Sequence, residues 1–253
     1  MTADVEALHA AVIAAPTEDG PRLAYADAIA ATDPDRAEYI RLEIALAGWR
    51  RTGPNSPERA KASVRAQLLL EKHRRAWEQG VRPLVDACGF LRGFVELVEL
   101  DAARFLQTAP ELYRRAPILH LDLTGVKPVA AKLFASPYLA RIESLGLVRN
   151  DLGDAEVARL AASPYLGRLA WLDLGVNAIG AAGLDALAAS DRLPRLGYVS
   201  LLANDVDDPT PKHCDGYERT SPAAQALIDK YGPRAWLDAR ERGTWPPHRD
   251  AVT

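Results

Sequence analysis

Leu145-Gly-Leu147 with Asn150 recurs 27 residues later as Leu172-Asp-Leu174 with Asn177, and again as Val199-Ser-Leu201 with Asn204. The tetrapeptide Ser-Pro-Tyr-Leu also occurs twice with this offset, at 136–139 and 163–166. Self-similarity at a fixed period is the sequence pattern of a repeat architecture, in which neighbouring units complete one another. The second half of the chain is therefore expected to be an array of similar units.

Each unit is predicted to combine a strand and a helix. The pattern L-x-x-L-x-L-x-x-N followed by a helical stretch is that of a leucine-rich repeat. Full units run over 118–141, 142–168 and 169–195, and a fourth strand lies at 196–202. One parallel sheet is expected, with strands at 95–100, 119–123, 143–147, 170–174 and 197–201. The strand leucines and the apolar helix positions would fill the interior, and each Asn would pair with buried turn groups.

The regions on either side of the repeats read as caps. Helices are predicted over 3–15, 22–31, from Asp33-Pro34 onward and over 58–79, with a linker at 52–57. Ser221-Pro222 begins a C-terminal helix, after a polar loop from Asp205 to Thr220. The predicted class is α/β: a short leucine-rich-repeat solenoid with helices outside a parallel sheet and an N-terminal all-α capping domain. The expected domains are 1–90, 91–202, and 203–253 with its loop, capping helix and tail.

Composition argues against several classes of function. The formal net charge is -3 and no segment is strongly basic, so the sequence disfavours nucleic-acid binding. No apolar run approaches the roughly 20 residues that span a bilayer, and the N-terminus lacks the pattern of a signal peptide. Two cysteines form no disulfide framework. These features predict a cytoplasmic protein that acts without a membrane, and they leave the oligomeric state open.

Residues 7–43 resemble the bacterial repeat-companion domain that precedes variable repeats. The resemblance is carried by Pro21-Arg-Leu-Ala-Tyr-Ala-Asp27, Asp33-Pro34 and Ala37-Glu-Tyr-Ile-Arg-Leu42, although Ala28 stands where the family usually has Trp. Arg92-Gly-Phe-Val-Glu-Leu-Val-Glu-Leu100 is similar to the usual entry into the repeats. The repeats resemble those of the ribonuclease-inhibitor type. The resemblance implies a curved fold used for recognition, and it implies no general activity.

The concave face of the predicted sheet is the candidate binding site. Residues beside the strand leucines point away from the core, and they bring carboxylates and two large aromatic side chains onto one surface. Exposed Trp and Tyr are typical anchors in interfaces, and the carboxylates favour a basic partner. The alternative is a solvated sheet whose aromatic rings fill the concavity. The predicted partner-binding residues are Glu99, Asp101, His120, Asp122, Trp171, Asp173 and Tyr198.

Two other groups of polar residues have mainly structural interpretations. Arg22, Tyr25, Asp27, Glu38 and Arg41 belong to the companion motif, and we expect them to fix the angles between short helices rather than to bind a ligand. The loop with Asp205, Asp207, Asp208, His213, Cys214 and Asp215 lacks the ligand spacing of a metal site. We therefore predict no metal and no cofactor.

The sequence also lacks a catalytic constellation. The leading prediction is a non-catalytic module that recognises a protein or peptide. One alternative is an accessory or inhibitor subunit of an enzyme or toxin. The other is an enzyme with a site between the helical cap and the first repeats, near Asp27, Arg41 and Glu99.

Overall fold

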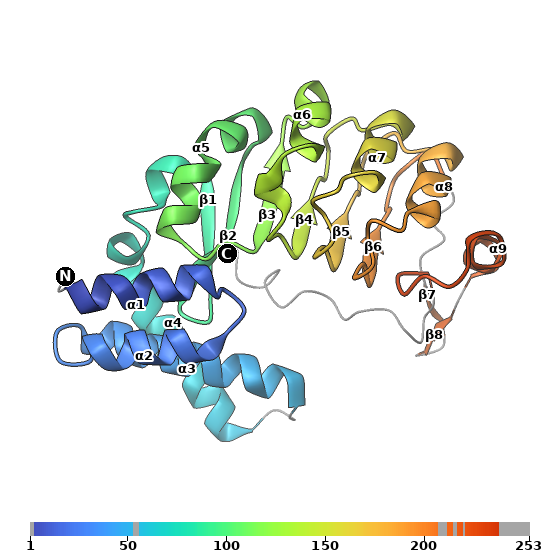
Figure 1. The fold of residues 1–253 in the computed structure, drawn as a ribbon. Helices are drawn as coiled ribbons and strands as arrows, with labels where there is room; N and C mark the ends of the chain where they lie inside the picture. Colours follow the sequence, from blue (N-terminus) through green and yellow to red (C-terminus); the bar gives the residue numbers. More distant parts are fainter. Residues whose placement is uncertain (1–2, 53–55, 207–211, 215–216, 220, 238–253) are drawn as a thin grey trace. The chain divides into compact units, whose positions relative to one another are not determined.

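A computed structural model describes residues 3–52, 56–206, 212–214, 217–219 and 221–237. The chain forms two compact units. Among described residues, unit 1 comprises the chain up to Val98 together with Pro110–Ile118, and unit 2 comprises Glu99–Ala109 and the chain from Leu119 onward. The structure confirms the α/β class, with N-terminal helices and a sheet whose strand order is β1-β2-β3-β4-β5-β6 (Figure 1).

Unit 1 is built mainly from the predicted N-terminal helices. Their bounds are Ala3–Ala14 for α1, Asp19–Ile29 for α2, Pro34–Thr52 for α3 and Pro57–Trp77 for α4. Ser56 caps α4 by accepting a hydrogen bond from the backbone N–H of Arg59 at 3.2 Å, and Pro57 occupies the first turn, where its missing N–H costs nothing. The helices enclose a core of small and branched apolar side chains: Val12, Ala26, Ile29, Ala37, Ile40 and Phe94.

A strand absent from the sequence prediction precedes the repeats. After the short 3-10 helix η1 (Arg82–Leu84), β1 spans Ala87–Leu91 and β2 spans Phe94–Asp101. The turn between them, Arg92-Gly93, has φ of 45° and 85°. A Cβ at Gly93 would stand 2.7 Å from the Cα of Ile40, so only glycine fits against α3 here. The turn therefore fixes β1 and β2 on the helices of unit 1.

A buried ion pair fastens this turn region to α2. The Arg22 guanidinium lies 2.8 Å from the Glu96 carboxylate, and the two side chains are 0% and 1% exposed. Arg92 donates to the second Glu96 oxygen at 2.9 Å, and both arginines donate to the carbonyl of Pro16. Arg22 is therefore structural, as predicted.

The other companion-motif residues also make contacts within unit 1. Asp27 and Arg41 form an exposed ion pair at 2.6 Å, and Glu38 pairs with Arg65. The Tyr25 ring contacts those of His9 and Phe94 at centroid distances of 5.7 and 5.5 Å, and these two rings are 6.2 Å apart. These contacts match the expected role of positioning the helices.

Unit 2 contains the periodic strands. Strand β3 spans His120–Thr124, β4 Ser144–Gly146, β5 Trp171–Asp173 and β6 Tyr198–Ser200. They pair in parallel, with Leu121, Leu145, Leu172 and Val199 in one register row. This confirms the predicted parallel pairing of these four strands, and each strand end lies one residue from its predicted bound.

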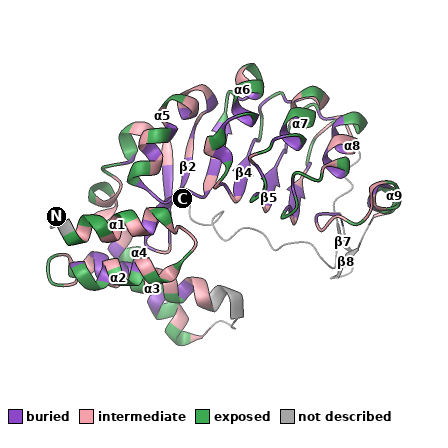
Figure 2. Cartoon of the chain, viewed as in Figure 1, coloured by how far each residue is buried: buried purple, intermediate pink, exposed green. Residues whose placement is uncertain are grey.

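Helices follow the strands at the predicted places. They are α5 (Ala102–Arg115), α6 (Ala130–Phe134), α7 (Asp154–Ala161) and α8 (Ala181–Ala189), with short 3-10 helices η2 (Lys127–Val129) and η3 (Pro137–Leu139). Helices α6, α7 and α8 line one side of β3–β6 (Figure 1). The strands and the inward helix faces are buried, while the outer helix faces are exposed (Figure 2).

The recurrent asparagines form the expected inward ladder. Asn177 Oδ1 accepts from the backbone N–H groups of Asn150 and Leu152 at 3.0 and 3.1 Å. Its Nδ2 donates to the carbonyls of Leu147, Leu174 and Gly175. Asn150 accepts from the Val126 N–H, and Asn204 accepts from the Ile179 N–H. Each amide thereby joins the turn of its own unit to that of the preceding one.

The C-terminal region contains a hairpin where the sequence predicted only a polar loop. Strands β7 (Lys212–Cys214) and β8 (Tyr217–Arg219) pair antiparallel. Alternating polar residues obscured these short strands. The predicted final helix is present as α9 (Pro222–Tyr231), and Ser221 caps it.

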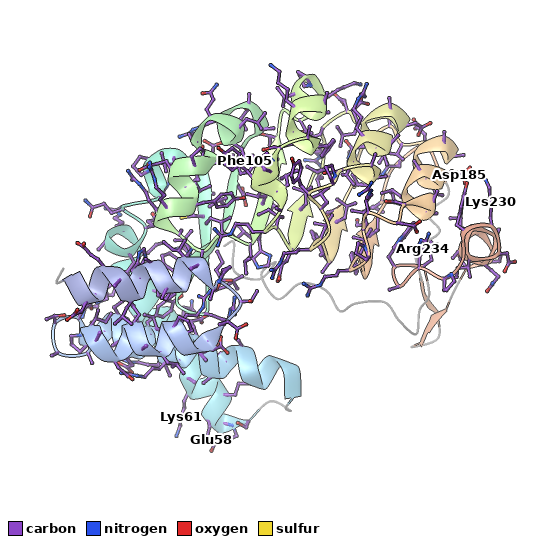
Figure 3. All side chains as sticks on the ribbon, viewed as in Figure 1. Glu58, Lys61, Phe105, Asp185, Lys230 and Arg234 are labelled. Carbon is purple, nitrogen blue, oxygen red and sulfur yellow. The ribbon has the colours of Figure 1, made fainter. Side chains whose placement is uncertain are left out.

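Helix α9 and the residues after it are attached to α8. Lys230 pairs with Asp185 at 2.9 Å, and Arg234 donates to the Ala188 carbonyl at 2.8 Å (Figure 3). Trp236 and Leu237 are buried. In the described part of the chain, no helix has both the length and the apolar character needed to cross a bilayer.

Candidate functional site

The predicted site residues of β3–β6 occupy two register rows on the side of the strands opposite the strand leucines. His120, Ser144, Trp171 and Tyr198 form the first row, and Asp122, Gly146, Asp173 and Ser200 form the second. We call this surface the helix-free face, because the described helices that follow β3–β5 lie along the other side. Glu99 and Asp101, at the end of β2, are both partly exposed.

The two aromatic residues meet, but they are not the exposed anchors that the sequence predicted. Trp171 and Tyr198 are adjacent in register and stack at a centroid distance of 5.6 Å, with their planes 19° apart. Their exposed fractions are only 6% and 9%. The two rings stack across the parallel pair of β5 and β6, and both side chains are buried. Trp171 and Tyr198 therefore support this face rather than project from it.

Two of the predicted carboxylates are engaged by backbone groups. Asp101 caps α5, accepting from the N–H groups of Ala103 and Arg104 at 2.9 and 3.1 Å. Asp173 is 2% exposed and accepts from the Gly175 N–H at 2.9 Å. Asp173 therefore lies buried beside its turn, and its contact with a partner stays a prediction. Short polar side chains readily satisfy nearby turn groups in this way.

The remaining predicted residues are partly exposed. The Asp122 carboxylate lies over Gly146 and fills the space that a side chain there would need. Glu99, His120 and Asp122 are each of intermediate exposure. Of the four predicted carboxylates, three are thus partly accessible and Asp173 is buried.

Among the described residues of unit 2, the large apolar side chains that are exposed lie just beyond these rows. Val148, Val176 and Leu202 follow β4, β5 and β6, and they are 36%, 40% and 70% exposed. The ladder of backbone hydrogen bonds continues here, from the Arg149 N–H to the Gly175 carbonyl and from the Val176 N–H to the Leu202 carbonyl. Val148, Val176 and Leu202 therefore lie on three successive, hydrogen-bonded turns, and we call them the turn strip.

The backbone of these turns is left-handed at one recurring position. This position directly precedes that of the recurrent asparagine, which is Val126 in the first unit. Its φ is 63° at Gly125, 58° at Arg149, 56° at Val176 and 56° at Ala203. Glycine adopts this conformation without cost, whereas a β-branched residue with positive φ is a genuine outlier. Such strain costs of order 1–3 kcal/mol and is concentrated at functional sites in proteins. Val176 thus combines a strained backbone conformation with an exposed apolar side chain.

This position was not singled out from the sequence. The repeat pattern indicates which residues flank the strand leucines, and Val148 and Leu202 belong to that set. It does not indicate that the residue before the Asn must be left-handed. A signal was nevertheless available, since Gly125 occupies this position in the first unit.

The described residues offer little for metal binding or nucleophilic catalysis. Among them, no three His, Cys, Asp or Glu side chains are grouped as metal ligands would be. Of the acidic loop considered above, Asp207, Asp208 and Asp215 lie outside the described residues. Cys88 is buried and free, and burial together with the nearby Glu78 carboxylate raises the pKa of its thiol to about 12. Its thiolate, the reactive form, is therefore scarce at neutral pH.

Comparisons of the chain with protein-family models, with curated proteins and with solved structures found no match.

Proposed function

We propose that this protein is a non-catalytic recognition module that binds a protein or peptide through the turn strip and the adjoining helix-free face. The observation that carries this proposal is the combination of exposure and strain at Val176. An exposed apolar side chain on a left-handed residue contributes little to stability, and glycine would relieve the strain. Binding a partner accounts for its presence, because the three apolar side chains lie on rigid neighbouring turns and can be buried together, with Val176 one residue later in its repeat than Val148 and Leu202.

The repeat architecture supports the same function. We interpret the strand-and-helix units as a short leucine-rich-repeat solenoid of the ribonuclease-inhibitor type, preceded by a repeat-companion domain. Such arrays hold successive turns in fixed register, so that a preformed row of side chains meets the partner. The free thiol of Cys88 is in keeping with a cytoplasmic location.

The chemistry of the site favours an apolar or amphipathic segment of the partner over a strongly basic one. The turn strip supplies three exposed apolar side chains, whereas Asp101 and Asp173 are already engaged by backbone N–H groups. Electrostatic attraction through Glu99 and Asp122 would then contribute mainly to the rate of association.

Peptide display on the immobilised full-length chain tests this function. We expect selected peptides to be rich in apolar residues and to bind the triple variant Val148→Ser, Val176→Asn, Leu202→Ser about tenfold more weakly or worse, a loss of roughly 1.4 kcal/mol. The matched control is Leu23→Ser, which removes an exposed apolar side chain from α2. Equal affinity for the triple variant and the wild type, measured by calorimetry, would refute the proposed site.

The strain at Val176 can be measured by a comparison with Val148. Both valines are similarly exposed, but only Val176 has positive φ. We expect Val148→Gly to destabilise the protein more than Val176→Gly, by about 1–2 kcal/mol, because glycine relieves the left-handed backbone only at 176. Urea titration of the two variants gives the difference. Equal losses of stability would show that Val176 carries no strain.

A further inference from the structure

Helix α4 has an exposed apolar pair on the side facing away from its own core. Val64 and Leu68 are 59% and 54% exposed and lie one helical turn apart. The opposite face of α4 buries Ala62, Ala66 and Leu69. Exposed apolar residues that recur on one helix face are a frequent mark of an interaction surface.

The exposed pair belongs to a longer line of residues. Alternating spacings of four and three residues define the contact line of a coiled coil. All members of the line on α4 are exposed, and we call it the α4 seam: Pro57, Lys61, Val64, Leu68, Glu71 and Arg75. The centre of the seam is apolar and its flanks are charged.

The seam is complementary to itself when it is reversed. Val64 and Leu68 lie on either side of its midpoint, and Lys61 and Glu71 are equally distant from that midpoint. In an antiparallel pair of identical helices, Val64 therefore meets Leu68 of the second copy, and Lys61 meets Glu71. Both contacts occur twice, as a two-fold interface requires. We propose that two copies of this protein associate through antiparallel pairing of their α4 helices.

The charges around the seam are arranged to permit this pairing. Arg65 lies beside the midpoint, where two copies would bring like charges together, but Glu38 of α3 holds it with hydrogen bonds of 2.8 and 2.6 Å. Lys72 is similarly paired with Asp35 at 2.8 Å. Lys61, in contrast, has no ion-pair partner within the described residues, and it projects outward from α4 with Glu58 (Figure 3). Lys61 is thus available to Glu71 of a second copy, whose carboxylate also accepts from Gln67 of its own helix at 2.9 Å.

Reversal of single charges provides a direct test on the full-length chain. A contact between two helices is small, so we expect the wild type to dimerise reversibly in the high-micromolar range. Lys61→Glu would face Glu71 across the interface, and Glu71→Lys would face Lys61. Each variant should weaken self-association by about tenfold or more, because both charged contacts become repulsive.

The same variants should recover association in two ways. Mixing Lys61→Glu with Glu71→Lys restores opposite charges at both contacts and should give a heterodimer. The double variant Lys61→Glu, Glu71→Lys should form a homodimer of nearly wild-type affinity. Sedimentation velocity over a concentration series measures all four samples, and circular dichroism verifies that each variant remains folded.

Two further variants identify the surface. Leu68→Glu should abolish the dimer, while Ser63→Glu, which is exposed on the same helix but outside the seam, should leave it intact. A wild type that stays monomeric at all concentrations would overturn the proposal. A dimer that survives Leu68→Glu would also overturn it. The same holds if mixing Lys61→Glu with Glu71→Lys gives no heterodimer.

Discussion

Replacing Glu96 with alanine is expected to lower the free energy of unfolding by about 3–5 kcal/mol, because it leaves a buried arginine without its carboxylate. Arg22 and Glu96 are almost fully buried and lie 2.8 Å apart. Burial lowers the pKa of the Arg22 guanidinium to about 10, yet the group remains protonated at neutral pH. Because arginine stays protonated in proteins, removal of Glu96 leaves an uncompensated charge in the interior of unit 1. Chemical denaturation of the full chain measures the loss.

An exposed ion pair in the same unit is the control. Asp27 and Arg41 are 2.6 Å apart, but their side chains are 74% and 42% exposed. Asp27→Ala should cost less than about 1 kcal/mol, since solvent screens the pair. If Glu96→Ala cost no more than Asp27→Ala, Arg22 would not depend on its carboxylate. The combined replacement Arg22→Met, Glu96→Leu should recover much of the loss, because it removes both charges together.

Replacing Asn177 with alanine is expected to cost about 2–3 kcal/mol, because several turn groups lose their partner at once. The amide accepts from two backbone N–H groups and donates to three carbonyls. Asn204→Ala should cost less, since Asn204 makes three such bonds and stands in the last unit. Urea titration of both variants tests this order. A negligible effect of Asn177→Ala would mean that water replaces the amide in these turns.

The sequence by itself determined strands β3–β6 of unit 2, the helices that follow them and the inward asparagines. These features recur with a fixed period, so the pattern in one unit supports the assignment of strand, helix and asparagine in the others. The side of a strand on which a residue lies also follows from alternation alone. For this reason Trp171 and Tyr198 were placed correctly on neighbouring strands, in one register row.

Only the tertiary structure decided which of these residues are accessible. Trp171 and Tyr198 stack and are buried, and the Gly175 N–H donates to the carboxylate of Asp173. Strand β1 and the Arg22–Glu96 pair likewise depend on segments that are distant in the chain. Alternation assigns a side chain to one face of a strand, but its exposure depends on which neighbours fold against it. The repeat period therefore predicted the scaffold, while side-chain packing shifted the candidate site from the aromatic pair to the strained, exposed turn at Val176.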